Sequence, residues 1–158
     1  MMKKTDTGRR WPLSAAMSAL ALAMSGCAVL DLPAETSQTV AEIESAEGVA
    51  ISYAASGEGE TTLVFIHGWS CDRSYWRNQV DLFDDAYRVI AVDLAGHGAS
   101  GSDRETWSME AFGADVAAAA RADDAQRVVL VGHSMGGPVM LETARLLGDR
   151  VVAMIGVD

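Results

Sequence analysis

Short apolar runs and amphipathic stretches alternate along residues 48–158. Two of the runs, TTLVFI and YRVIAV, are apolar almost throughout, which is typical of strands buried on both faces of a sheet. The complete set of runs predicts strands at 49–54, 61–66, 87–92, 127–131 and 151–157. A Gly57-Glu58-Gly59 turn separates the first two.

Helical periodicity fills the intervals between the later strands. Apolar side chains recur at i, i+4 and i+7 within 75–83, which predicts one amphipathic helix. Ser108 is a suitable N-cap for a second helix that extends to about residue 122. A third helix is predicted over 135–147, closed by Gly148.

The predicted order is therefore β, β, α, β, α, β, α, β. Strands separated by helices need crossover connections, and these join parallel neighbours. We expect an α/β fold, a three-layer α/β/α sandwich around a mostly parallel sheet.

Charge is distributed unevenly over the 158 residues, whose formal net charge is −10. The first 26 residues carry four basic side chains and one acid, a local charge of +3, whereas the remainder carries eight arginines, no lysine and 21 acids, or −13. An acidic body repels the phosphates of nucleic acids, so binding to nucleic acid is not expected. A content of 49% hydrophobic residues excludes disorder as the main state.

The basic N-terminus is followed by an apolar run of 12 residues at 13–24, too short for a permanent membrane span. We interpret 1–26 as a signal peptide. The sequence Met24-Ser25-Gly26-Cys27 resembles a bacterial lipoprotein lipobox, which implies lipidation of Cys27, a membrane anchor and location in the cell envelope. A plain signal peptide cleaved after a small residue such as Ala23 is the alternative. Residues 27–47 are interpreted as a polar tether, and 48–158 as the folded domain.

Candidate chemistry lies in the turns between strands and helices. Gly132-His133-Ser134-Met135-Gly136 matches G-x-S-x-G and falls directly between a predicted strand and a predicted helix. A sharp turn at this place lifts a serine hydroxyl out of the sheet, and the flanking glycines avoid clashes in the tight backbone. The pattern therefore predicts a nucleophilic serine at the amino end of a helix.

Two further motifs agree with this interpretation. His67-Gly68-Trp69 follows the strand at 61–66, and Asp93-Leu94-Ala95-Gly96-His97-Gly98-Ala99-Ser100 follows the strand at 87–92. With these motifs the chain resembles the N-terminal portion of the α/β-hydrolase superfamily, which combines an HGx oxyanion motif, a D-x-x-G-x-G-x-S loop and a GHSMGG elbow. The resemblance extends over about 48–158.

The resemblance implies roles for individual residues. Ser134 would be the nucleophile, and the backbone N–H groups of Trp69 and Met135 would form the oxyanion hole. The histidines at 67, 97 and 133 would have structural roles in their own motifs. Nothing in the sequence has the spacing of a metal site or of a dinucleotide-binding loop, so no metal or cofactor is expected.

A serine nucleophile needs a general base, normally a histidine held by a carboxylate. In the resembled family this histidine follows the final strand, so the chain is expected to be a fragment truncated after about the sixth family strand. Asp158, at the end of the strand at 151–157, is a candidate for the acid or a structural residue.

The resemblance implies a serine hydrolase that acts on a small carboxylic ester or a related acyl substrate. A serine at the nucleophile position argues against epoxide hydrolase and haloalkane dehalogenase chemistry, because those enzymes use a carboxylate nucleophile. The alternative hypothesis, which the missing base favours, is a non-catalytic envelope lipoprotein or an inactive truncated relative.

Overall fold

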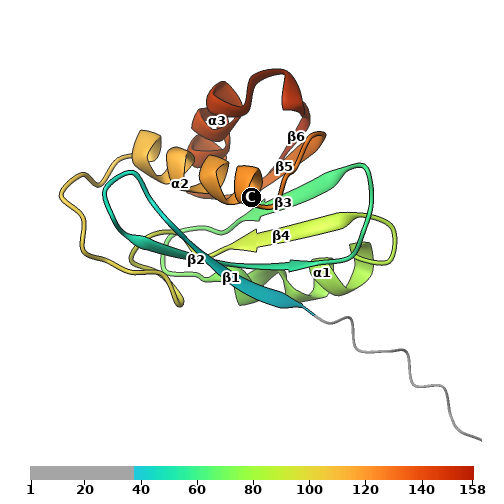
Figure 1. Ribbon diagram of the computed structural model, residues 1–158, viewed down its shortest axis with the longest axis horizontal. Helices are drawn as coiled ribbons and strands as arrows, with labels where there is room; N and C mark the ends of the chain where they lie inside the picture. Colours follow the sequence, from blue (N-terminus) through green and yellow to red (C-terminus); the bar gives the residue numbers. More distant parts are fainter. Residues whose placement is uncertain (1–37) are drawn as a thin grey trace, which may run out of the picture. The chain divides into compact units, whose positions relative to one another are not determined.

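A six-stranded sheet runs through residues 38–158, the part of the chain that the computed structural model describes (Figure 1). The strands are β1 Thr39–Glu44, β2 Ala50–Ser56, β3 Thr62–Ile66, β4 Arg88–Val92, β5 Val128–His133 and β6 Val151–Val157. Their order in the sheet is β1-β2-β4-β3-β5-β6. Strands β4, β3, β5 and β6 are parallel, whereas β2 is antiparallel to both β1 and β4. The prediction of a mostly parallel sheet is confirmed.

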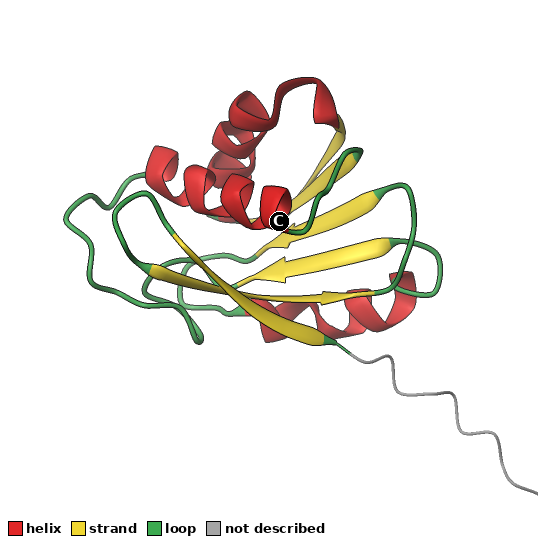
Figure 2. Cartoon of the chain, in the orientation of Figure 1, coloured by secondary structure: helices red, strands yellow, loops and turns green. Residues whose placement is uncertain are grey.

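Helices lie on both faces of this sheet, as Figure 2 shows. They are α1 Arg77–Phe83, α2 Met109–Ala122 and α3 Gly136–Leu147, with 3₁₀ turns at Arg73–Trp76 and Gly148–Arg150. Helix α1 lies on one face, and α2 and α3 pack together on the other (Figure 1). The predicted three-layer arrangement is therefore confirmed.

The ends of the helices follow local rules. The hydroxyl of Ser108 accepts a hydrogen bond of 3.2 Å from the Ala111 N–H, which makes Ser108 the predicted N-cap of α2. Gly148 closes α3 with φ of +58°, in the left-handed region where glycine is favoured.

The apolar core is divided by the sheet into two clusters. The larger one joins β2, β3, β4 and β5 to α2 and α3, with Ile51, Ile66, Ile90, Val116 and Leu130 fully buried. The smaller one packs Trp76 and Val80 against Phe65 and its neighbours on the α1 face. Alternate residues of β3 contribute to opposite clusters, as expected for a strand that is buried on both faces.

Strand β1 corrects part of the sequence interpretation. The polar sequence of 27–47 predicts a tether, but Thr39–Glu44 pairs along its whole length with β2. Only Ala41 and Ile43 of this edge strand are partly buried, and its other four residues are exposed. The polar composition is therefore that of an edge strand with one face in water. The predicted signal peptide, Cys27 and the first part of the tether lie outside the described residues.

Strand β6 forms the opposite edge of the sheet, and most of its side chains are exposed. Val152, Met154, Ile155 and Val157 are between 37% and 50% exposed. Among the strands of the described part of the chain, β6 has the largest number of exposed, large apolar side chains.

Candidate active site

The turn between β5 and α3 has the geometry of a nucleophile elbow. Ser134 is exposed and has φ of +50°, a left-handed conformation that costs a residue other than glycine roughly 1–2 kcal/mol. Its neighbours explain the need for glycine: a Cβ at Gly132 would lie 2.5 Å from the Gly136 oxygen. A Cβ at Gly136 would lie 2.4 Å from the oxygen of Ile66 in β3. Gly132 thus allows the serine turn to close on itself, and Gly136 allows the turn to pack tightly against β3.

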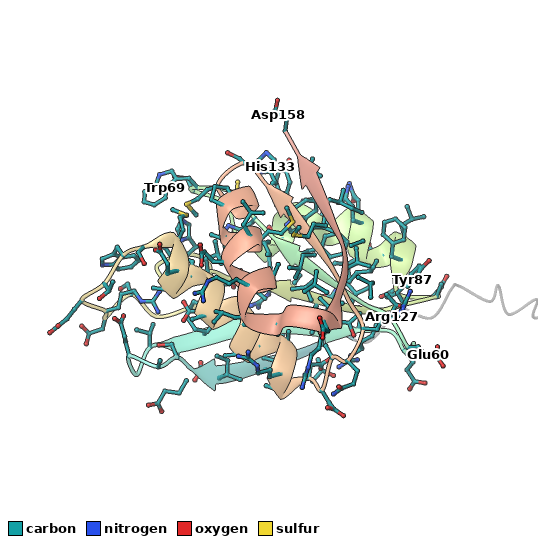
Figure 3. The ribbon with its side chains drawn as sticks, turned by 90° about the horizontal axis from the view of Figure 1, so that it is seen from above. Glu60, Trp69, Tyr87, Arg127, His133 and Asp158 are labelled. Atoms are coloured by element: carbon teal, nitrogen blue, oxygen red, sulfur yellow. The ribbon has the colours of Figure 1, made fainter. Side chains whose placement is uncertain are left out.

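The loop after β3 reaches the same turn. A Cβ added at Gly68 would lie 3.2 Å from the Cβ of Ser134 and 2.8 Å from Nδ1 of His133. Trp69, His133 and Asp158 lie at one end of the sheet, whereas Glu60, Tyr87 and Arg127 lie at the other (Figure 3). The structure therefore brings the HGx motif and the G-x-S-x-G motif into contact at the carboxyl ends of the parallel strands.

Two backbone N–H groups belong to the two motifs that meet at this turn. Within residues 38–158, neither the N–H of Trp69 nor that of Met135 donates a hydrogen bond to a protein acceptor. Met135 directly precedes α3, so its N–H points out of the positive end of the helix. Free donors of this kind are what an oxyanion requires.

His67 is fully buried and connects two loops. Its Nε2 accepts a hydrogen bond of 3.1 Å from the Leu94 N–H, so the ring proton must be on Nδ1. Nδ1 then donates to the Gly68 oxygen at 2.8 Å. Burial lowers the pKa of His67, which keeps the ring neutral. Both nitrogens are occupied, so His67 orients the HGx loop and cannot abstract a proton from Ser134.

The other two histidines also lie in the loops around the site. Nδ1 of His97 is 3.0 Å from the Ala95 oxygen. The His133 ring stacks on Tyr75 with centroids 4.6 Å apart. No hydrogen bond among residues 38–158 joins a histidine nitrogen to the Ser134 hydroxyl. The described part of the chain therefore supplies no histidine base to this serine.

Asp93 organises the D-x-x-G-x-G-x-S loop and is buried. Its carboxylate accepts hydrogen bonds from the Arg73 backbone N–H at 2.7 Å, the Arg73 guanidinium at 2.8 Å and the Ala99 N–H at 2.9 Å. Gly98, with φ of +54°, packs against the Asp93 side chain. A Cβ at Gly98 would lie 2.3 Å from the Asp93 carboxyl carbon. The motif thus fixes a loop next to the site.

A buried ion pair beside this loop was not predicted. The Arg104 guanidinium donates two hydrogen bonds to the Asp115 carboxylate, at 2.9 and 3.0 Å, and both side chains are at most 2% exposed. Arg104 Nε is also 3.2 Å from a carboxylate oxygen of Glu47. Burial raises the pKa of Asp115, while Arg104 opposes the rise. The two partners belong to a loop and to α2, so sequence periodicity gives no signal for the pairing.

Asp158 follows β6 at the same end of the sheet as His133, the residue before Ser134 (Figure 3). The Ser134 N–H donates to the oxygen of the preceding residue, Val157, at 3.1 Å. Strand β6 therefore supports the elbow through its backbone. The acid role of Asp158 stays a prediction.

Residues 38–158 contain no cluster of three or more histidine, cysteine or acidic side chains arranged to hold a metal ion. In the same part of the chain, no helix has both the length and the apolar character needed to cross a membrane.

Comparison with known proteins agrees with the fold. The profile of the alpha/beta hydrolase family matches residues 63–158. The chain therefore belongs to the alpha/beta hydrolase family.

Its relatives have diverse activities. The chain is 34% identical over 115 residues to the dihydrolipoyllysine-residue acetyltransferase component of the acetoin cleaving system of Cupriavidus necator, covering 70% of this chain and 31% of that protein. It is 35% identical over 111 residues to epoxide hydrolase 3 of Xenopus tropicalis, covering 68% and 30%. The structure resembles a thermophilic esterase from Thermogutta terrifontis with a TM-score of 0.66 at 31% identity, covering 75% and 44%. The chain thus spans less than a third of the length of these two curated relatives.

Proposed function

We propose that this chain carries the nucleophile and the oxyanion hole of a serine hydrolase that acts on carboxylic esters or related small acyl compounds. The observation that carries the proposal is the left-handed conformation of Ser134, between β5 and the amino end of α3. Strain of this kind persists only where the surrounding structure enforces it, and it is concentrated at functional sites. Membership of the alpha/beta hydrolase family supports the assignment.

In the proposed reaction, Ser134 Oγ attacks the carbonyl carbon of the ester and transfers its proton to a base. The carbonyl oxygen becomes an oxyanion that accepts hydrogen bonds from the N–H groups of Trp69 and Met135. Collapse of this intermediate breaks the bond to the alcohol, which leaves with a proton, and water then releases the acid from the acyl-serine. A serine rather than a carboxylate at position 134 favours this chemistry over the reaction named for the epoxide hydrolase relative.

The base is the element that residues 38–158 do not provide. An oxyanion hole and binding alone retain about 10³–10⁴-fold acceleration over water when triad members are removed. We therefore expect slow covalent modification of Ser134 by a reactive probe, even where turnover of an ester is weak.

The test is incubation of the full chain with a fluorophosphonate probe and a chromogenic short-chain ester. We expect one adduct, mapped to Ser134 by mass spectrometry, and its loss in Ser134→Ala. Ser74→Ala, which removes another exposed serine, should still be labelled. If the folded protein shows no labelling and no turnover, the proposal is refuted and the non-catalytic alternative is favoured.

From the sequence we also propose export and lipid anchoring to a cell-envelope membrane through Cys27. Metabolic labelling with a fatty acid should mark the wild-type chain and be absent from Cys27→Ala. Equal labelling of both would refute the anchor.

A further inference from the structure

Beside the oxyanion loop there is a pocket that the proposed reaction does not use. Its volume is about 420 Å³, and it is lined by Trp69, Ser70, Gly96, His97, Ser102 and Trp107. These residues come from the loop after β3 and from the long loop between β4 and α2. The pocket therefore shares Trp69 with the HGx motif, while most of its wall belongs to another segment.

The two tryptophans are unusually exposed for side chains of their size. Trp69 is 67% exposed and Trp107 is 50% exposed, although the third described tryptophan, Trp76, is buried in the core. The Trp69 ring meets His97 edge-on at 5.3 Å between centroids. Aromatic surface of this extent around one hollow marks a binding site more often than a random surface.

The backbone is shaped to hold Trp107 in place. Gly96 has φ of +74°, and a Cβ there would lie 2.9 Å from the Trp107 ring. The ring also packs against Phe112, and the Arg104 guanidinium lies 5.9 Å from its centroid. A glycine in a left-handed conformation thus makes room for an indole whose other surface is in water.

The charges around the pocket favour a cation. The two nearest guanidinium groups are already paired, Arg73 with Asp93 and Arg104 with Asp115. The exposed carboxylates in the same loops are Asp103 and Glu105, and Asp72 lies two residues beyond Ser70. Hydrogen bonds from Ser74 lower the pKa of Asp72 and keep it ionised. Residues 27–158 carry eight arginines against 21 acids, so the chain attracts a cation rather than an anion at long range.

We propose that this pocket binds the quaternary or alkylated ammonium group of an organic cation, with the Trp69 and Trp107 rings as its walls. Aromatic faces attract cations through their quadrupole, and an alkylated ammonium has the apolar surface that an indole wall can cover. The net negative charge of residues 27–158 adds long-range attraction without contributing a direct ligand. This inference concerns binding alone, so it does not depend on the proposed hydrolase activity.

The test is a titration of the full, isotope-labelled chain with choline, followed through the indole N–H signals by NMR. The neutral isostere 3,3-dimethylbutan-1-ol is the matched ligand control. We expect saturable shifts of the Trp69 and Trp107 signals with choline, unchanged Trp76, and affinity for the isostere about tenfold lower. Substitution of each tryptophan by phenylalanine assigns the signals.

Substitutions distinguish how much the aromatic and the acidic side chains each contribute to choline binding. Trp107→Ala should weaken choline binding at least about fivefold, and Asp103→Asn with Glu105→Gln should weaken it and reduce its dependence on salt. Leu82→Ala, which removes a 70% exposed leucine of α1, should have no effect. Equal affinity for choline and its isostere would overturn the proposal, and so would the absence of saturable shifts in a folded chain.

Discussion

Replacing Ser134 by glycine should stabilise the fold although it removes the proposed nucleophile. A left-handed backbone costs serine roughly 1–2 kcal/mol, and glycine relieves this cost. Glycine also gains about 0.5–1 kcal/mol of freedom in the unfolded chain, which offsets part of the benefit. Alanine relieves no strain. We therefore expect Ser134→Gly to exceed Ser134→Ala in unfolding free energy by about 0.5–1 kcal/mol.

Urea denaturation measures the difference. With a slope of about 1–3 kcal/mol per molar, the midpoints of the two variants should differ by roughly 0.5 M. Ser74 is the control, because it lies in a 3₁₀ turn and has a negative φ. There the order should reverse, with glycine less stable than alanine by about 0.5–1 kcal/mol. If glycine is also the less stable residue at position 134, the elbow holds no strain and the argument fails.

Three other perturbations follow from the structure. Asp115→Asn should cost about 3–5 kcal/mol, because it leaves the buried Arg104 charge with only the partly exposed Glu47 as a counter-charge, whereas Arg104→Met with Asp115→Leu should cost far less; a double-mutant cycle in urea checks this, and equal losses would contradict it. Gly98→Ala should destabilise by about 2 kcal/mol or more, because the new Cβ meets the Asp93 carboxylate at a positive φ; a thermal midpoint equal to that of the wild type would rule out the clash. The pKa of His67 is lower in the folded state than in the unfolded state, so unfolding takes up a proton at acidic pH. The contribution of His67 to the free energy of unfolding should therefore be complete above about pH 6.5 and decline below it. His67→Gln should remove this part of the pH dependence, which urea titrations at several pH values would measure.

The sequence predicts the interior of this fold more accurately than its edges. Strands β3 and β4 are buried on both faces, so their continuous apolar runs identify them within one residue. Strand β1 is different, because only Ala41 and Ile43 are partly buried, and the acids that follow each of them make the segment resemble a polar tether. The signal that could have identified it is this two-residue alternation.

The candidate active site is also predictable from the sequence only in part. The elbow and the HGx loop are predictable because glycine spacing expresses a local steric need, as the close approach of Gly68 and Gly136 demonstrates. The Arg104–Asp115 pair and the pocket between Trp69 and Trp107 depend on tertiary contacts between loops and helices. No periodicity in the sequence encodes such contacts.

The hydrogen bond from the Ser134 N–H to the Val157 oxygen joins the serine turn to the outermost strand of the sheet. Edge strands open more readily than central ones, since one side of their ladder is unpaired. Fraying of β6 therefore releases the amide of Ser134 at the same time. We therefore expect the serine turn and β6 to open together, and amide hydrogen exchange should report equal protection for the two.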